Sequence, residues 1–225
     1  SGNRALLRKE SMVNYCLNIA KREAEMLQER LRLAKANDDP IEEEEFIDAT
    51  LLDEDLAKVD LKSVRLINCK FERCNFSRAG FYNCFFSHCD FSNCAFTESY
   101  WKQSRVESSR GDGAEFSGTH FKESVFADSS FCYANFTKAS FEYFSLERCL
   151  CKEAFFTEAR LKKIVFDTVD LSRADFFKTP LKGVDLSSCI ISGIMVSDSF
   201  RELAGAKIDL SQAEDIAVML GVKIV

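Results

Sequence analysis

The sequence is poor in residues that many enzyme sites and loop-rich folds require. Its 225 residues include two prolines, two histidines and one tryptophan. His88 and His120 are the only histidines, and no Ser-His-Asp or Cys-His arrangement can be built around either of them. The sequence therefore predicts no catalytic, cofactor-binding or metal-ligating residues, and we do not expect an enzyme.

Long hydrophobic runs and an excess of positive charge are also missing. No stretch approaches the roughly 18 consecutive apolar residues of a membrane-spanning helix, and the N-terminus lacks the layout of a signal peptide. The 30 basic and 36 acidic residues give a formal net charge of −6, which argues against a generally basic nucleic-acid-binding protein. We expect a folded cytoplasmic protein without a membrane partner, and direct nucleic-acid binding is disfavoured.

The ten cysteines do not have the spacing of a zinc site. Zinc sites favour a C-x-x-C pair, which brings two thiolates onto one ion, and no such pair occurs. Five cysteines are instead separated by multiples of five: Cys69, Cys74, Cys84, Cys89 and Cys94. The cysteines are therefore interpreted as part of a repeat, with reduced thiols that serve packing.

A five-residue repeat runs from Phe46 to Val196 without insertion or deletion. Of its 31 positions, sixteen are Phe and nine are Leu, and only Gly111 breaks the apolar rule, so we expect a local irregularity there. In 26 of the 31 units, the residue two before this core position is small or β-branched. A period of five fits neither a helix nor a flat strand, so the chain must turn regularly.

Units such as Cys69-Lys70-Phe71-Glu72-Arg73 and Ala134-Asn135-Phe136-Thr137-Lys138 resemble those of the pentapeptide-repeat family. The resemblance implies an all-β solenoid, a right-handed quadrilateral β-helix with four units per coil. The Leu and Phe side chains would stack inward, with every twentieth core residue in one column. Cys69 would lie one coil from Cys89, and Cys74 one coil from Cys94, near enough for a disulfide but expected to be reduced.

Both flanks of the repeat are predicted to be helical caps. Residues 1–37 contain no proline and carry apolar residues at spacing seven, which predicts an amphipathic helix. Residues 38–45 read as an acidic linker, residues 46–196 as the β-helix and residues 197–225 as a C-terminal cap. In the cap, Asp209 or Ser211 could begin a helix that ends at Gly221.

The C-terminal segment is similar to that of the Qnr-type and mycobacterial fluoroquinolone-resistance proteins within the family. In those proteins the last helix joins two rods end to end, so the resemblance implies a homodimer through Ala213, Ile216, Ala217 and Leu220. Two features differ from the Qnr type. The unbroken register leaves no projecting loops, and the long N-terminal helix is not part of the usual pattern.

The register also assigns charges to the sides of the predicted rod. Units centred at 46, 66 and onward to 186 form an acidic side with a balance of −3, and its candidate partner-binding residues are Glu107, Asp128, Glu147, Asp167 and Asp185. Units centred at 61, 81 and onward to 181 form a basic side with a balance of +4, on which lysines follow the core position: Lys62, Lys102, Lys122, Lys162 and Lys182. Either side could bind a partner, or simply be solvated.

Two functions remain open at this point. The first is a non-enzymatic protein-interaction scaffold that uses the rod surface and the N-terminal helix. The alternative, implied by the C-terminal resemblance, is a DNA-mimicking protein that binds DNA gyrase and protects it from fluoroquinolones. The repeat sums to only −2, from 19 basic and 21 acidic residues, so mimicry would have to rest on one side of the rod. No cofactor is expected for either function.

Overall fold

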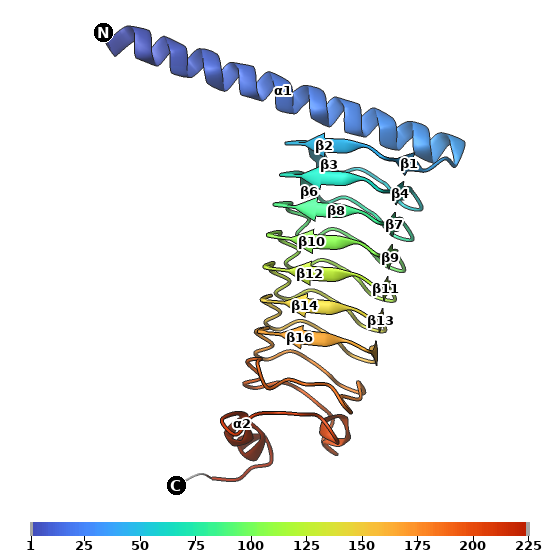
Figure 1. Cartoon of the computed structure of the whole chain (residues 1–225), viewed down its shortest axis with the longest axis vertical. Coiled ribbons are helices and arrows are strands. Elements are labelled where there is room, and N and C mark those ends of the chain that lie inside the picture. The colour runs from blue at the N-terminus through green and yellow to red at the C-terminus, as the bar shows by residue number, and fades with distance from the viewer. Residues whose placement is uncertain (1, 224–225) are drawn as a thin grey trace.

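The computed structural model describes the backbone of residues 2–223 and the side chains of residues 18, 19 and 21–223. The chain forms a long helix, a rod of stacked coils and a small C-terminal cap (Figure 1). Helix α1 spans Gly2–Asn37, and the cap holds the 3₁₀ helix η1 (Arg201–Leu203) and helix α2 (Gln212–Met219). The predicted pentapeptide-repeat β-helix with a helix at each end is confirmed.

Parallel ladders of very short strands hold the coils together. The basic side is a seven-stranded sheet: β1 (Ile41–Glu42), β4 (Asp60–Lys62), β7 (Gly80–Tyr82), β9 (Tyr100–Lys102), β11 (His120–Lys122), β13 (Ser140–Glu142) and β15 (Arg160–Lys162). The acidic side is a second one: β2 (Glu45–Ile47), β5 (Arg65–Ile67), β8 (Phe85–Ser87), β10 (Arg105–Glu107), β12 (Val125–Ala127), β14 (Ser145–Glu147) and β16 (Val165–Asp167).

The remaining two sides are built mainly from turns. The third side, whose core residues run from Leu51 to Ile191, contains the strand pair β3 (Thr50–Leu52) and β6 (Lys70–Glu72). Isolated parallel bridges continue this side and the fourth side, whose core residues run from Leu56 to Val196. Register partners on every side are twenty residues apart until Asp185, which bridges to Lys207. Four units of five therefore make one coil.

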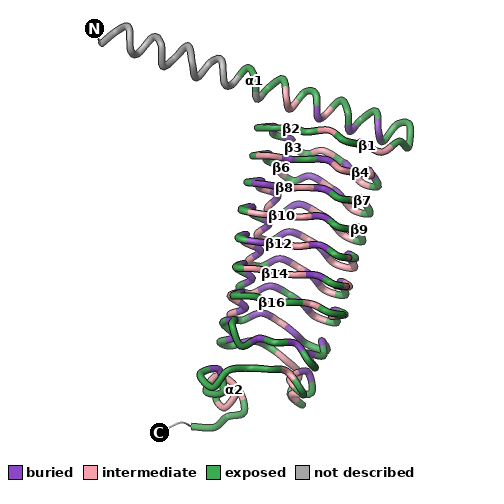
Figure 2. Tube along the Cα trace, in the orientation of Figure 1, coloured by how far each residue is buried: buried purple, intermediate pink, exposed green. Residues whose placement is uncertain are grey.

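The interior of the rod is a stack of aromatic rings. Rings one coil apart in the column Phe76, Phe96, Phe116, Phe136, Phe156 and Phe176 have centroids 4.9–5.1 Å apart and lie within 14° of parallel. This column confirms the predicted one. Figure 2 shows buried residues recurring along every coil. The second residue after most core positions has a positive φ, as at Asn68 and Arg73, and this left-handed residue turns the chain at each corner.

The acidic linker predicted for residues 38–45 belongs instead to the first coil. Ile41 is buried and pairs with Leu61, and Glu45 already lies in β2. Ile41 precedes Phe46 by five residues, so it occupies one further core position. The surrounding carboxylates hid this position in the sequence, because the residue two before it is Asp39 rather than a small one.

Gly111 does not mark the irregularity expected from the sequence. Its N–H donates to the carbonyl of Ser130 at 2.8 Å, so the ladder is intact. The space that a side chain would fill is taken by Phe91 and Phe131, whose ring centroids are 6.1 Å apart across the glycine. A Cβ at this position would lie 2.5 Å from the Phe91 ring and 2.9 Å from the Phe131 ring.

Gly111→Ala is therefore expected to destabilise the rod by about 1–3 kcal/mol, because the added methyl group overpacks the core. The φ of Gly111 is not in the left-handed region, so alanine adds no backbone strain there. Urea unfolding would measure the loss. An unchanged unfolding midpoint would mean that the two rings separate without cost, contrary to this prediction.

Candidate interaction surfaces

Helix α1 packs on the N-terminal end of the rod. Leu27, Leu31 and Ala34 are buried and join the hydrophobic core of the first coils. Polar contacts surround them. Lys35 Nζ lies 2.6 Å from Asp55 Oδ2, Gln28 donates a hydrogen bond to Glu54, and Arg30 pairs with Glu44. The helix thus covers the open end of the solenoid and protects its exposed strand edges.

The same helix carries a second apolar stripe that the rod does not cover. Ile19, Met26 and Leu33 follow one another at spacing seven, and each directly precedes a residue of the helix's apolar face. All three side chains are at least 40% exposed. One apolar stripe is sufficient to cap the rod, so the second is available for contact with another protein.

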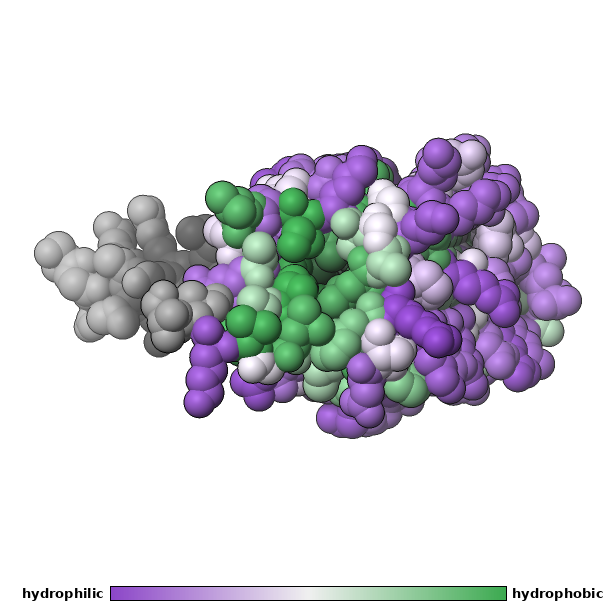
Figure 3. Space-filling model, turned by 90° about the horizontal axis from the view of Figure 1, so that it is seen from below, coloured by the Kyte–Doolittle hydropathy of each residue, from purple (hydrophilic) through white to green (hydrophobic). Residues whose placement is uncertain are grey.

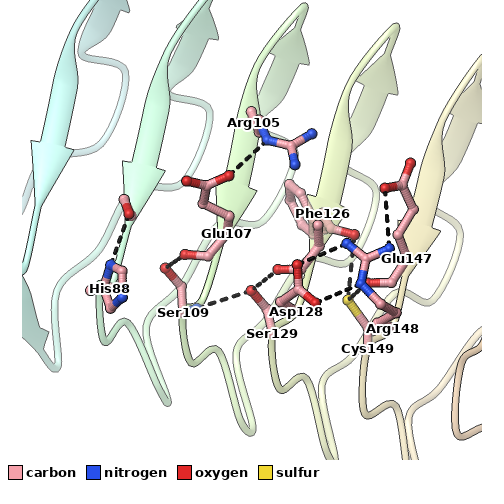
Figure 4. Close-up of polar contacts among 12 residues, drawn as sticks. His88, Arg105, Glu107, Ser109, Phe126, Asp128, Ser129, Glu147, Arg148 and Cys149 are labelled. Carbon is pink, nitrogen blue, oxygen red and sulfur yellow. Dashed lines mark hydrogen bonds and ion pairs between the residues drawn. The ribbon is translucent and has the colours of Figure 1, made fainter.

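The acidic side carries fewer free carboxylates than its sequence suggests (Figure 4). Arg148 donates hydrogen bonds to both oxygens of Asp128, at 2.7 and 2.8 Å, and holds the pKa of that carboxyl below its ordinary value. Arg148 also lies 3.9 Å from Glu147, and Arg105 donates to Glu107 at 2.9 Å. Three of the five candidate residues on this side therefore have an arginine partner.

The other two candidates on the acidic side are placed differently. Within the described part of the chain, Asp167 and Asp185 make no ion pair at 4.0 Å or less. Asp185 instead accepts hydrogen bonds from the N–H and the hydroxyl of Ser187, at 3.0 and 2.6 Å. Asp167 accepts a hydrogen bond from the Thr168 hydroxyl at 3.0 Å. Among the five candidates, negative charge without an ion-pair partner in the described chain therefore lies at the C-terminal end of this side.

The lysines of the basic side divide into paired and unpaired members. Lys62 Nζ lies 2.8 Å from Glu42, and Lys162 Nζ lies 2.5 Å from Glu142. Among residues whose side chains are described, Lys102, Lys122 and Lys182 have no such partner. Lys102 and Lys122 are direct register partners on neighbouring strands. The middle of this side therefore carries two adjacent positive charges that have no ion-pair partner among the described side chains.

Ion pairs between neighbouring coils were not anticipated from the sequence, although the sequence contains their signal. Arg73 pairs with Asp53, Arg148 with Asp128 and Lys162 with Glu142, and each pair is separated by twenty residues. Opposite charges at a spacing of one coil would have identified them. Exposed pairs of this kind contribute little stability, but they decide which charges remain available to a partner.

The C-terminal cap is locked onto the rod by Gln212. Its side-chain amide donates to the carbonyls of Leu186 and Cys189, at 2.7 and 2.6 Å, and its side-chain oxygen accepts the N–H of Asp209 at 2.9 Å. The Asp209 carboxylate accepts the N–H of Gln212 at 2.8 Å, so Asp209 rather than Ser211 supplies the helix cap. Gly221 ends the segment with a positive φ, as predicted.

The four residues predicted to form a dimer interface do not share one surface. Ile216 packs against the core of the rod and Ala217 is half-buried beside it, whereas Ala213 and Leu220 are exposed. The outward apolar residues of the cap are Leu210, Val218, Leu220 and Val222, which are 91%, 61%, 56% and 53% exposed. Figure 3 views this end and shows a hydrophobic band across it.

The nine described cysteines are free, and most are buried beside the core. Burial raises the pKa of Cys84 and of Cys149 to about 11. Both thiols are therefore expected to resist iodoacetamide near pH 8 in the folded protein and to react only after unfolding, because the thiolate is the nucleophile. Peptide mapping by mass spectrometry would check this, with half-buried Cys132 as the internal control that reacts first. Modification of Cys84 before Cys132 would contradict it.

Neither a metal site nor a membrane span is visible in the described chain. No three His, Cys, Asp or Glu side chains among the residues described converge as metal ligands would. No described helix has the length and hydropathy needed to cross a bilayer. His88 and His120 are both exposed, and the His88 ring lies 2.9 Å from the Ser87 hydroxyl.

Comparison with known proteins identifies the repeat. The pentapeptide-repeats family matches residues 55–100, 112–148 and 154–193, in eight copies. A search of curated proteins found no match. A trypsin-treated variant of QnrB1, a plasmid-mediated fluoroquinolone resistance protein, is 24% identical with a TM-score of 0.51, over 83% of this chain and 97% of that one.

Two further solved structures are less similar. Full-length QnrB1 is 22% identical with a TM-score of 0.48, over 81% of this chain and 97% of that one. HetL, a pentapeptide repeat protein involved in heterocyst differentiation regulation from the cyanobacterium Nostoc sp., is 14% identical with a TM-score of 0.28, over 74% and 87%. The likeness to the QnrB1 variant shows a shared fold.

Proposed function

Because this chain belongs to the pentapeptide-repeat family, we propose that it is a non-enzymatic scaffold that binds partner proteins through α1 and the outer surface of the rod. The interior is filled by stacked rings, so the chemistry available to a partner lies on the outside. We further propose that it works in the cytoplasm, where its free cysteines would stay reduced. Two copies would join through the C-terminal cap.

The observation that carries this proposal is the exposed stripe of Ile19, Met26 and Leu33 on α1. The other stripe of the helix, Leu27, Leu31 and Ala34, already caps the end of the rod. An amphipathic helix with an uncovered apolar stripe is a common way of recognising another helix or a groove. The stripe therefore supports a second role for α1 beyond capping.

The test is a crosslinking pull-down from the source cell with the Met26→Glu, Leu33→Glu double variant. Leu27, Leu31 and Ala34 are unchanged, so the cap on the rod should remain. Partners recovered with the unmodified protein should be lost. The matched control is Ile47→Glu with Leu52→Glu, because these side chains are similarly exposed but lie on the rod. Loss with both variants, or with neither, would contradict a role for the stripe.

The alternative function is binding and protection of DNA gyrase, and its support is the fold shared with a fluoroquinolone resistance protein. The arginines that pair with Glu107, Asp128 and Glu147 count against it, because DNA mimicry needs free negative charge. Under the scaffold proposal, an excess of the protein should leave the fluoroquinolone inhibition of gyrase supercoiling unchanged. Protection that is lost on changing Asp128, Glu147 and Asp167 to Lys would establish the alternative.

A further inference from the structure

Unpaired positive charge on the rod is concentrated on one side. Of the 19 lysines and arginines between residues 46 and 196, thirteen make an ion pair. The six that have no ion pair within the described chain are Lys58, Lys102, Lys122, Arg160, Lys163 and Lys182. All except Lys58 belong to units of the basic side. The other sides are thus largely neutralised by contacts between coils, whereas the basic side is not.

The unpaired cations form two groups along the basic side. Lys102 and Lys122 lie on adjacent strands, β9 and β11, where like charges in register repel one another. Arg160, Lys163 and Lys182 lie nearer the C-terminal end, around β15. The carboxylate between the groups, Glu142, is held by Lys162. Of the other acidic residues of this side, Glu42 is held by Lys62. Within the described chain, Asp39, Glu43, Asp60 and Glu123 pair with none of these five cations at 4.0 Å or less.

The backbone ladder of the basic side ends at the second group. In the coil before, Arg160 N–H donates to Ala139 at 2.9 Å and Tyr143 N–H donates to Lys162 at 3.0 Å. One coil later Pro180 has no N–H to donate, and no backbone hydrogen bond joins described residues 160–163 to 180–183. Strand β15 is the last strand of its sheet. The N–H groups of Leu161 and Lys163 therefore donate to no backbone carbonyl of the next coil.

We propose that the basic side binds an extended acidic peptide segment of a partner protein, an inference that rests on the proposed scaffold function. Carboxylates of the peptide would contact Lys102 and Lys122 at one end, and Arg160, Lys163 and Lys182 at the other. Coils at the ~4.8 Å spacing of strands put the outer lysines about 19 Å apart, which about six residues of extended chain can span.

A short acidic peptide fits this side better than a nucleic acid does. Binding of single-stranded nucleic acid relies on aromatic rings that are free to stack on bases. The two rings beside Lys102 are those of Tyr82 and Tyr100, which are half-buried and pack on each other with centroids 5.7 Å apart. A third ring on this side, Tyr143, is 54% exposed, and the Lys162 ammonium lies 6.0 Å from its centroid. The chain as a whole carries a net charge of −6, which opposes a dense polyanion more than a short segment with a few carboxylates.

The test uses the full-length protein and a fluorescent eight-residue peptide of alternating Glu and Thr, with the Gln-Thr peptide as its neutral control. Anisotropy titration should show binding of the acidic peptide alone, weakened by added salt. Lys102→Glu with Lys122→Glu should reduce the affinity at least about tenfold, and so should Lys163→Glu with Lys182→Glu. Circular dichroism would verify that each variant is folded.

The matched control is Lys138→Glu with Lys178→Glu, which changes the net charge equally on the fourth side, where both lysines are paired with Glu158. Its affinity should stay within about twofold of the unmodified protein. Equal loss in this control, no binding at millimolar peptide, or tighter binding of an eight-nucleotide oligothymidylate would each overturn the proposal. None of these results would affect the capture of partners through α1 in the pull-down. The scaffold proposal and the acidic-peptide proposal can therefore fail separately.

Discussion

Replacing Phe116 by alanine is expected to lower the free energy of unfolding by about 3–5 kcal/mol, the largest stability effect we predict. The Phe116 ring is fully buried and stacks on Phe96 and Phe136, at 4.9 and 5.1 Å between centroids. Rings above and below are fixed by their own backbone ladders and cannot close the cavity. Denaturant unfolding would measure the loss, and amide exchange should show it first in neighbouring coils.

Phe155→Ala is the matched control for this measurement. Phe155 immediately precedes the core position of its unit, and its ring is 41% exposed. We expect its removal to cost less than about 1 kcal/mol. Similar losses for the two variants would mean that the buried aromatic column stabilises the rod no more than exposed rings do, contrary to this prediction.

Val218→Asp with Leu220→Asp is expected to give monomers at micromolar concentration, because two unpaired charges in an apolar interface should weaken dimerisation by at least about a hundredfold. Both side chains are more than half exposed at the C-terminal end. Light scattering would report the mass, and an unchanged far-ultraviolet spectrum would show that the rod is intact. The control is Val165→Asp, which is similarly exposed on the acidic side.

Ile216→Asp should behave differently from this pair. Ile216 packs against the rod, so a charge there would detach α2 and remove the interface indirectly. Trypsin would then cleave after Lys207 faster than in the Val218 and Leu220 variant, because only the Ile216 variant exposes that segment. A monomeric unmodified protein at micromolar concentration would show that the hydrophobic band at this end does not join two copies.

The fold was predictable from the sequence because its core has a single short period. Sixteen Phe and nine Leu at five-residue spacing admit one register over residues 46–196, and the observed partners follow it. Two local predictions were wrong because neighbouring residues obscure the five-residue period. Ile41 was missed among carboxylates, and Gly111 was misread because two phenylalanines fill its space from coils on either side.

The binding surfaces were less predictable than the fold. Whether a surface side chain is free to bind another protein depends on contacts with residues that are distant in the sequence. Charge counts gave the acidic side a surplus, yet Asp128 is held by an arginine twenty residues away. Likewise, helical spacing could not separate Ile216 from Leu220, because the direction from which the rod approaches α2 is fixed by Gln212. Sequence patterns identify the sides of the rod, and contacts between coils determine which residues on them remain free.

The regular register also limits how the length of this protein can change. Core side chains repeat every five residues, but cross-coil pairs such as Asp53 with Arg73 repeat every twenty. Removing one unit would keep all later core residues inward while moving every later surface residue onto the adjacent side. Removing one coil would shorten the rod and leave each side in place. Insertions and deletions should therefore be compatible with the core in steps of five residues, but with the binding surfaces only in steps of twenty.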